Sequence, residues 1–366
     1  MVITLEKKEF AEAVLRVARF AERRSATLPV LAGIAIIAGD DGIKLRATNL
    51  ETGIDLRVNG TIETPGVVVL PATTLREITG SFTDTGLIKL EHTGETVILG
   101  SKAGKSTLKT LAYEDFPTLP LPDAGKTKFS LAGSSLRALV GAVAAYASPS
   151  TVRPELGSVL LSAEAGTIKA VATDSFRLAE KRMPVSGSIT PFSILIPAKN
   201  ALDIVQTIPD DNVEVLIDEH QCAFSWNTGL VTTRLVTVPY PDYTQIIPKS
   251  FSCEATVLKK DFEAVLRRTA VFSDSFQKIR VSFSVPDKQL FFSARNSDVG
   301  ESNESVTSSL TGEPIELSFN HRYLSAPLSL ITSENLSLSS AGIGRPLVIR
   351  GVGDNTFLYL VMPMNQ

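Results

Sequence analysis

The stretch Phe10-Ala-Glu-Ala-Val-Leu-Arg-Val-Ala18 decides the fold, because its pattern occurs three times in the chain. Leu136–Ala144 and Phe262–Ala270 repeat it, and both intervals are 126 residues (136 − 10 and 262 − 136). Each copy places apolar residues at i, i+4, i+7 and i+8, the pattern typical of one face of an amphipathic helix. Three such helices at one fixed interval predict a threefold internal repeat.

Length and composition exclude several classes of protein. A chain of 366 residues with 43% hydrophobic and 20% charged residues suits two or three domains with substantial cores. No apolar run approaches the roughly 18 residues that span a bilayer, and Met1–Lys8 lacks the order of a signal peptide. Cys222 and Cys253 are isolated, so we expect reduced, structural cysteines in a cytoplasmic protein. A net charge of −3 argues against indiscriminate nucleic-acid binding.

A second helix belongs to each repeat. Pro71 and Pro197 lie 126 residues apart (197 − 71), and each precedes a short helical stretch. Proline suits a helix start because its missing N–H is not needed there. In the third copy Asn320 can cap the helix instead.

Strand-like alternation surrounds these helices. Hairpins are predicted around the turn at 92–95, the turn containing His220 and the turn at 342–344. The fold class is therefore α+β, with three tandem copies of a domain of two helices and roughly eight strands. Segments that join an aromatic residue to proline close the copies and place the domains at residues 1–122, 126–248 and 252–366.

Candidate catalytic groups are weak. Gly104-Lys105-Ser106 resembles the end of a phosphate-binding loop, but the full motif needs glycine at position 99, where Leu99 stands, and a helix afterwards. His92 and His220 occupy equivalent turns (220 − 92 = 128), which indicates solvated turn residues. We find no constellation for acid–base or nucleophilic catalysis, no metal-binding motif and no cofactor site.

Basic residues collect on and beside the predicted helices, interleaved with acidic ones such as Glu9, Glu12 and Glu263. They are equally compatible with an ordinary solvated surface and with a surface that faces phosphates. Val171–Leu178 fits neither helical nor strand periodicity, and taken alone it predicts a strand end with an Asx turn.

Several motifs together resemble one known family. They are Thr27-Leu-Pro29, Ala172-Thr-Asp174 with Arg177-Leu178, Tyr240-Pro-Asp-Tyr243 and the terminal Val361-Met-Pro-Met364. Together with the threefold repeat they resemble the bacterial replicative sliding clamp, the beta subunit of the replicative DNA polymerase. The resemblance covers the whole chain.

The resemblance implies a non-catalytic processivity factor. Members of the family close as a head-to-tail homodimer into a six-domain ring that encircles double-stranded DNA. A closed ring can hold DNA by topology, so its phosphate contacts need only be weak and independent of sequence. The implied partners are the polymerase catalytic subunit, a clamp loader, and other polymerases and repair proteins that bind through short peptides. No membrane partner and no cofactor are implied.

The resemblance also assigns sites to particular residues of this chain. Methionine and proline make an adaptable apolar groove, which suits many short peptides. The peptide groove would be formed by Leu156, Thr173, Ser175, Phe176, Arg177, Leu178, Pro241, Ile246, Asn320, Tyr323, Val361, Met362, Pro363 and Met364. DNA contacts would be made by Arg23 or Arg24, with Arg153 and Lys199 as further candidates. Phe176 stands where the family commonly has histidine.

Opposite charges suggest the seam between two subunits. We expect the strand around Lys102, Lys105 and Lys109 to pair with the stretch Glu301–Glu304 of another copy, because unpaired strand edges need covering. Val271 and Phe272 would fill an apolar pocket there. Two alternatives stay open: a repeat-built enzyme acting on phosphorylated substrates through Gly104–Ser106, and a monomeric peptide-binding scaffold.

Overall fold

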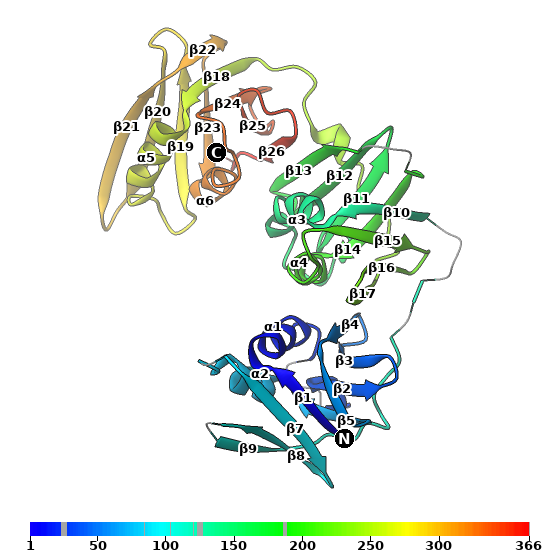
Figure 1. The fold of residues 1–366 in the computed structure, drawn as a ribbon. Helices are drawn as coiled ribbons and strands as arrows, with labels where there is room; N and C mark the ends of the chain where they lie inside the picture. The colour runs from blue at the N-terminus through cyan, green and yellow to red at the C-terminus, as the bar shows by residue number, and fades with distance from the viewer. Residues whose placement is uncertain are drawn as a thin grey trace. The chain divides into compact units, whose positions relative to one another are not determined.

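Four antiparallel sheets and six short helices make up the part of the chain that the structure, a computed structural model, describes. It describes residues 1–22, 28–83, 85–102, 104–119, 121–122, 127–185 and 189–365. The chain divides into two units, Met1–Ala138 with Lys199–Thr237 and Leu139–Ala198 with Val238–Gln366. Figure 1 labels the elements of both.

The first unit contains two sheets. One has the order β5-β1-β7-β8-β9 and the other β10-β15-β16-β17-β4-β3-β2-β6. The strands of the first sheet are β1 (Val2–Glu6), β5 (Gly60–Thr64), β7 (Leu87–Thr93), β8 (Thr96–Ser101) and β9 (Gly104–Lys109). Those of the second are β2 (Gly33–Gly39), β3 (Gly42–Thr48), β4 (Thr52–Val58), β6 (Gly66–Pro71), β10 (Thr127–Ala132), β15 (Asn212–Ile217), β16 (Gln221–Trp226) and β17 (Gly229–Arg234).

Helices α1 (Lys7–Val17) and α2 (Ala72–Gly80) pack against each other in this unit. Phe10, Val14 and Val17 are fully buried along one face of α1, so the periodicity of the opening stretch does mark the core. Helices α3 (Gly133–Gly141) and α4 (Ala198–Val205) contain two of the three points at which the chain passes between the units, and the third lies between Thr237 and Val238.

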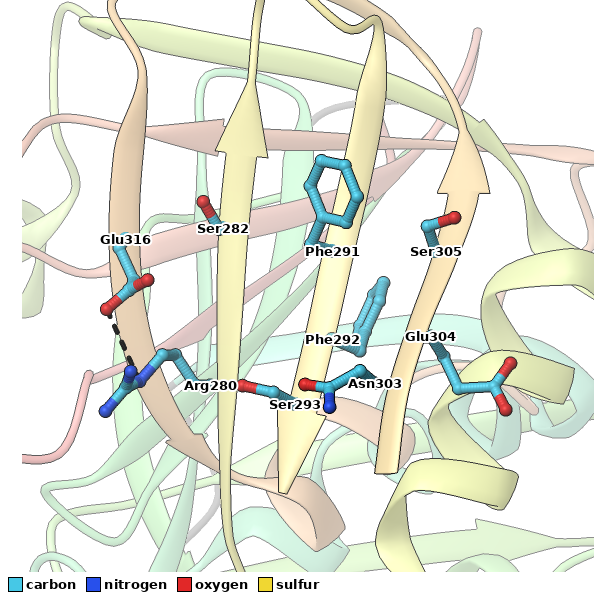
Figure 2. A pocket seen from close by; sticks show the side chains of 9 residues that line it. All are labelled: Arg280, Ser282, Phe291, Phe292, Ser293, Asn303, Glu304, Ser305 and Glu316. Atoms are coloured by element: carbon cyan, nitrogen blue, oxygen red, sulfur yellow. Dashed lines mark ion pairs between the residues drawn. The ribbon is translucent and has the colours of Figure 1, made fainter. Parts of the chain in front are cut away.

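The second unit also contains two sheets, in the orders β14-β11-β12-β13-β26-β25-β24-β18-β22 and β21-β20-β19-β23. The nine strands of the larger sheet are β11 (Ser158–Glu164), β12 (Thr167–Thr173), β13 (Arg177–Pro184), β14 (Phe192–Pro197), β18 (Cys253–Leu258), β22 (Ser309–Gly312), β24 (Asn335–Ser340), β25 (Leu347–Gly351) and β26 (Phe357–Val361). The smaller sheet, drawn in Figure 2, has β19 (Lys278–Ser284), β20 (Gln289–Asn296), β21 (Gly300–Thr307) and β23 (Ile315–Asn320). Its helices are α5 (Lys259–Ala270) and α6 (His321–Ser325).

Both long sheets run from one sequence repeat into the next. β17 pairs with β4 from Gly229↔Leu56 to Thr233↔Thr52, and β26 pairs with β13 from Val361↔Arg177 to Phe357↔Lys181. The central repeat therefore shares one sheet with each neighbour. This sharing explains why the contacts define two units where the sequence has three copies.

β9 and β21 are two of the edge strands of the four sheets. β9 ends the five-stranded sheet and β21 ends the four-stranded one, and neither has a further strand beside it within the described ranges. An edge strand presents a row of unpaired N–H and C=O groups, which favours pairing with another chain.

The predicted helices and hairpins are confirmed. Asn320 caps α6, with its Oδ1 accepting a hydrogen bond from the Arg322 N–H at 2.9 Å. One difference concerns α3, which stops at Gly141 although the pattern continued to Ala144; residues 144–146 form a 3-10 turn, η2 (Ala144–Tyr146). Glycine disfavours the helix interior, which accounts for the early end. Gly104–Lys109 is the strand β9 and not the helix that a phosphate-binding loop requires.

In the central repeat, an arginine of the first helix, α3, donates hydrogen bonds to carbonyl groups at the end of the second helix, α4. Arg137 donates from Nε to the carbonyl oxygen of Val205 and from a terminal nitrogen to that of Ile208, each at 2.9 Å. It also forms an ion pair with Asp210. These carbonyls lie at the end of α4, where a helix leaves acceptors unpaired.

The first residue of the first helix, α1, α3 or α5, differs among the three repeats. Lys7 and Lys259 begin α1 and α5, and the Lys259 ammonium donates to the carbonyl oxygen of Ile331 at 2.6 Å. Gly133 holds the same place in α3 (133 − 7 and 259 − 133 are both 126). A Cβ at Gly133 would overlap the carbonyl oxygen of Pro209, so the close approach of the chain excludes a side chain.

Candidate functional site

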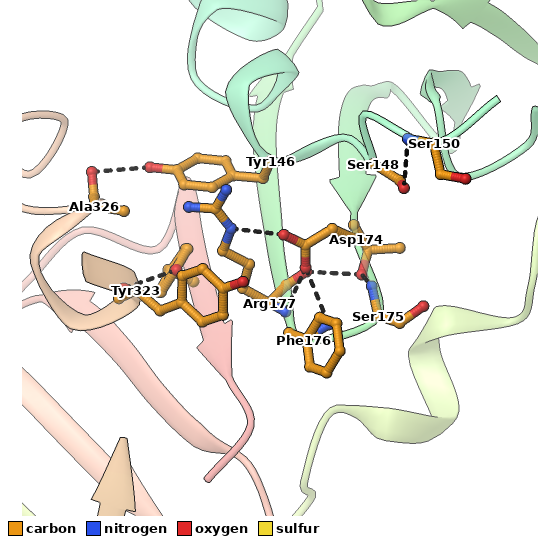
Figure 3. Close-up of polar contacts among 11 residues, drawn as sticks. Tyr146, Ser148, Ser150, Asp174, Ser175, Phe176, Arg177, Tyr323 and Ala326 are labelled. Atoms are coloured by element: carbon orange, nitrogen blue, oxygen red, sulfur yellow. Dashed lines mark hydrogen bonds and ion pairs between the residues drawn. The ribbon is translucent and has the colours of Figure 1, made fainter. Parts of the chain in front are cut away.

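A tight turn between β12 and β13 presents Phe176 to the solvent. The hydroxyl of Thr173 donates to the carbonyl oxygen of Arg177 at 2.7 Å, and Asp174 Oδ1 accepts from the N–H groups of Phe176 and Arg177 at 3.0 Å each. Ser175 adopts a left-handed conformation with φ of 77°. The turn leaves Phe176 60% exposed. Figure 3 shows its ring beside Ser175 and Arg177.

Arg177 is enclosed between two aromatic rings. Its guanidinium carbon lies 5.2 Å from the ring centroid of Tyr146 and 4.7 Å from that of Tyr323, within the range of cation–π attraction. Its Nε donates to Asp174 Oδ2 at 2.8 Å. Burial lowers the pKa of Arg177, but the hydrogen bond and charge of Asp174 outweigh it, so the pKa is raised. The side chain is permanently charged and fixed in place (Figure 3).

Tyrosine hydroxyls tie this cluster to the loop after α6. Tyr146 donates to the carbonyl oxygen of Ala326 at 3.0 Å, and Tyr359 donates to that of Tyr323 at 2.8 Å. Burial raises the pKa of Tyr146 to about 12, so this phenol stays protonated and remains a donor at neutral pH. The rings of Tyr146 and Tyr359 also meet, with centroids 5.1 Å apart.

The C-terminal segment lies between the turn and β23. The N–H of Met362 donates to the carbonyl oxygen of Phe176, and the N–H of Met364 donates to that of Ser318, both at 2.8 Å. The side chains of Met362, Pro363 and Met364 are partly exposed. They add an apolar strip next to the exposed Phe176 ring.

A groove of about 380 Å³ adjoins this strip. It is lined by Gln245, Ile246, Pro248, Lys249, Ser250, Ala341, Gly344, Arg345, Pro346 and Met362. One wall is the 3-10 turn η3 (Tyr243–Ile246), which is held because Tyr243 donates its hydroxyl to the buried carboxylate of Glu180 at 2.6 Å. Asp242 caps the same turn.

All the predicted groove residues lie in the second unit, and their roles differ. Leu156, Leu178 and Val361 are buried and support the surface from beneath. Ile246 and Met362 line the groove, while Pro241 lies exposed just before η3.

Sequence reasoning missed several residues of this region. Tyr146 encloses Arg177, and Lys249, Arg345 and Pro346 line the groove. Tyr146 follows a helix that ended early, and the two cations stand in loops, so no periodic signal marked any of them.

Of the predicted DNA-contacting residues, the structure describes Arg153 and Lys199. Arg23 and Arg24 lie outside the described residues. Arg153 is exposed and donates from Nε to Glu155 at 2.9 Å. Lys199 is exposed near the start of α4, in the first unit. Three arginines on or beside the helices, Arg16, Arg19 and Arg137, line a hollow of about 420 Å³ in that unit.

The predicted seam residues lie on the two open edges. Lys105 and Lys109 are exposed on β9, Lys102 lies two residues before its start, and Glu301 is exposed on β21. Glu304 differs, because it accepts a hydrogen bond from Arg268 of its own chain at 2.7 Å, which lowers the pKa of Glu304. Figure 2 shows the smaller sheet that ends in β21.

Exposed apolar side chains accompany this edge. Val271 is 64% exposed at the end of α5, next to the partly buried Phe272. Phe276 and Val299, at 72% and 57% exposure, were not predicted. Isolated apolar residues in loops carry no periodic signal, so only their exposure in the structure reveals them.

Three family models match consecutive parts of the chain. They are the N-terminal domain of the DNA polymerase III beta subunit at residues 1–120, its central domain at 130–242 and its C-terminal domain at 244–365. Together they cover nearly the whole sequence.

Individual relatives agree with these models. The beta sliding clamp of Synechococcus elongatus is 28% identical over 345 residues, covering 92% of each chain. That of Bacillus subtilis is 26% identical, covering 100% of this chain and 99% of the relative. The crystal structure of the DNA polymerase III beta subunit of Pseudomonas aeruginosa superimposes with a TM-score of 0.92 at 26% identity over both full chains. The Thermotoga maritima subunit, at 22% identity, shares the fold with a TM-score of 0.94 over 100% of this chain and 99% of its own.

The protein is thus a clamp subunit built from three domains of mixed helix and sheet. Such subunits are non-catalytic processivity factors of a DNA polymerase. The chain belongs to the family of bacterial DNA polymerase III beta subunits, the beta sliding clamps. The alternative of an enzyme acting on phosphorylated substrates has no support from these matches. No helix in the described ranges is long and apolar enough to cross a membrane.

Proposed function

We propose that two copies of this chain close head to tail into a six-domain ring, which encircles duplex DNA and holds the replicative polymerase on its template. The observation that carries the proposal is the way in which the sheets join. Both junctions within the chain pair the last strand of one repeat with a strand of the preceding repeat, β17 with β4 and β26 with β13. β9 and β21 are the equivalent strands that lack this partner.

The internal junctions also supply a register for the seam. Gly104 opens β9 as Gly229 opens β17. Glu301 pairs with Arg295 near the end of the β20–β21 hairpin as Gly53 pairs with Thr48 at the end of the β3–β4 hairpin, so Glu304 takes the place of Leu56. Transferring the Gly229↔Leu56 pairing sets Gly104 opposite Glu304 and Thr107 opposite Glu301. Side chains alternate between the faces of a strand, so Lys105 and Lys109 come diagonally beside Glu301. A heterologous contact of this kind gives a closed ring when the rotation per unit divides the circle.

The peptide groove is proposed to hold the partners one at a time. The exposed Phe176 ring, the Met362–Met364 strip and the groove beside Ile246 offer adaptable apolar contacts to short peptides. Polymerase catalytic subunit, clamp loader and repair proteins would compete for it. The domains are proposed to be residues 1–122, 126–248 and 252–366, and the protein is proposed to act in the cytoplasm.

DNA binding is proposed to be weak and independent of sequence. Arg23 or Arg24, Arg153 and Lys199 would contact phosphates. The chain has a net charge of −3, which suits a ring that slides along DNA more than a ring that binds DNA tightly.

Retention on circular DNA tests the ring. The clamp is loaded onto nicked circular DNA by a clamp loader and ATP, and the complex is separated from free protein by gel filtration. Most of the clamp should stay with the circle and leave when a restriction enzyme linearises it. Equal retention on circular and linear DNA would rule out topological linkage and with it the proposal.

A further inference from the structure

We propose that the groove beside Met362 recognises a carboxylate next to the apolar anchors of its peptide, through Lys249 and Arg345. This rests on the proposed peptide-binding function and adds a charge requirement to it. The ligand is a short peptide segment that carries aspartate, glutamate or a free C-terminus beside apolar side chains.

The charged residues that line the groove are all positive. Among its ten lining residues Lys249 and Arg345 are cationic, and none is acidic. Both side chains are exposed, and neither has a hydrogen-bond or ion-pair partner among the residues that the structure describes. Exposed cations elsewhere in this unit are often paired, as Arg280 is with Glu316 at 3.3 Å.

The backbone fixes both cations beside the apolar strip. Leu347 pairs with Val361, so Arg345 and Pro346, directly before Leu347, lie beside the residues that follow Val361. The Arg345 N–H donates to the carbonyl oxygen of Gly342 at 3.2 Å, which closes the turn that carries it. Lys249 stands three residues after η3, which Tyr243 anchors to Glu180.

The two acidic residues that flank Lys249 in the sequence, Asp242 and Glu254, have other partners, and Glu254 Oε1 accepts a hydrogen bond from the Ser339 hydroxyl at 3.2 Å. Asp242 uses its two carboxylate oxygens within η3, accepting from Thr244 at 2.5 Å and from the Gln245 amide at 2.9 Å. Both hydrogen bonds lower the pKa of Asp242, so the carboxylate stays ionised and engaged at neutral pH. The charge of Lys249 and Arg345 therefore remains available to a ligand.

The apolar surroundings favour a peptide over nucleic acid. Ile246 is 46% exposed and Ile343 is 75% exposed, and Ile246 and Met362 line the groove together with two prolines. A phosphate backbone would leave these side chains in water, whereas a peptide can bury them and still bring a carboxylate to the cations. Opposite charge at the rim of an interface contributes chiefly to selectivity and association rate.

A peptide selection tests the inference on the full-length protein. Random octapeptides displayed on phage are selected on wild type, and one selected sequence is synthesised with its acidic residues and with the matching amides. Affinities are measured by fluorescence anisotropy for wild type, Lys249→Glu/Arg345→Glu and the control Lys288→Glu, an exposed lysine in another turn of the same unit. The acidic peptide should bind the double variant at least about tenfold more weakly than wild type, while the control is unaffected.

The remaining outcomes separate the two proposals. Amide substitution should weaken binding to wild type and remove the difference between wild type and the double variant. Selected peptides that are apolar but not acidic, or that bind the double variant equally well, would overturn the charge requirement alone. Failure to select any apolar peptide, or selected peptides indifferent to Phe176→Asp, would refute the groove itself. Loss of duplex DNA binding in the double variant with intact peptide binding would assign the cations to nucleic acid and overturn the inference.

Discussion

At the scale of single residues, Arg177 illustrates how one side chain can hold a functional surface in place. It contacts Asp174 through a hydrogen bond and Tyr146 and Tyr323 through its planar face. Tyr323 also stacks on the exposed Phe176, with ring centroids 6.4 Å apart. The orientation of the groove surface therefore depends on a partly buried cation that need not contact a peptide itself.

Replacing Arg177 with lysine should destabilise the protein although the charge is kept. Lysine lacks the flat guanidinium that fits between two rings and the fixed Nε–H that meets Asp174. We expect a loss of about 1–3 kcal/mol in the free energy of unfolding, measured by urea denaturation. Arg280→Lys is the control, because its pair with Glu316 is exposed and should cost less than about 0.5 kcal/mol. Equal losses in both variants would contradict the role given to the rings.

Two glycines of α3 give a matched pair. Gly133→Ala forces a Cβ against the carbonyl oxygen of Pro209, so we expect a destabilisation of about 2–3 kcal/mol. Gly141→Ala meets nothing within 4 Å and should be neutral or stabilising by up to roughly 1 kcal/mol. Shifts of the thermal unfolding midpoint in opposite directions would agree with this assignment, and a harmless Gly133→Ala would contradict it.

At the scale of helices and strands, the repeats perform the same task with different residues. Lys259 reaches a carbonyl from the start of α5, whereas α3 begins with glycine and Arg137, one turn later, reaches the end of α4. The basic residues of the helices are thus of two kinds. Some hold the second helix in place, and others, such as Arg16, have no side-chain partner among the described residues.

Removing Arg137 should therefore affect stability. Arg137→Ala leaves the carbonyl groups of Val205 and Ile208 without their donors, which should cost about 1–3 kcal/mol. Arg16→Ala removes an exposed arginine from the same hollow and should stay within about 0.5 kcal/mol of wild type. Urea denaturation monitored by circular dichroism checks both, and equal stability of the two variants would argue against the distinction.

The local elements could be predicted from the sequence because their signals are local. The 126-residue interval and the period of the apolar residues predicted α1, α3 and α5, and alternation around turns predicted the hairpins. The joining of sheets between repeats could not be predicted, because Gly229 and Leu56 lie 173 residues apart (229 − 56) and leave no periodic trace. The bond from Tyr146 to Ala326 spans 180 residues for the same reason.

The local geometry of the candidate site could be predicted in part from the sequence. Val171–Leu178 fits neither periodicity, and the structure shows that this stretch contains the turn that presents Phe176. The cations of the groove were missed because Lys249 and Arg345 are common loop residues whose unpaired state appears only when their neighbours are known.

At the scale of the whole molecule, the proposed ring depends on the edge strands β9 and β21. Glu304 is already bonded to Arg268, so the exposed Glu301 is the better choice for a charge test of the seam. Lys105→Glu and Glu301→Lys should each weaken the dimer by about five- to tenfold in dissociation constant, and the two together should restore it.

Analytical ultracentrifugation at several protein concentrations measures these constants. Glu316→Lys, a reversal on β23 at the far end of the same sheet, is the control and should leave the dimer intact. A double variant as weak as the single ones would show that the two strands do not meet in this register.

Sheets that continue across the repeat boundaries have a practical consequence for fragments. A truncation that isolates the central repeat would remove β4 from β17 and β26 from β13. Two strands would then expose unpaired backbone donors and acceptors. Such a fragment should precipitate or assemble into strand-swapped oligomers. Because β4 lies in the first repeat and β26 ends at Val361 in the third, a fragment that keeps both long ladders whole must retain strands from all three repeats.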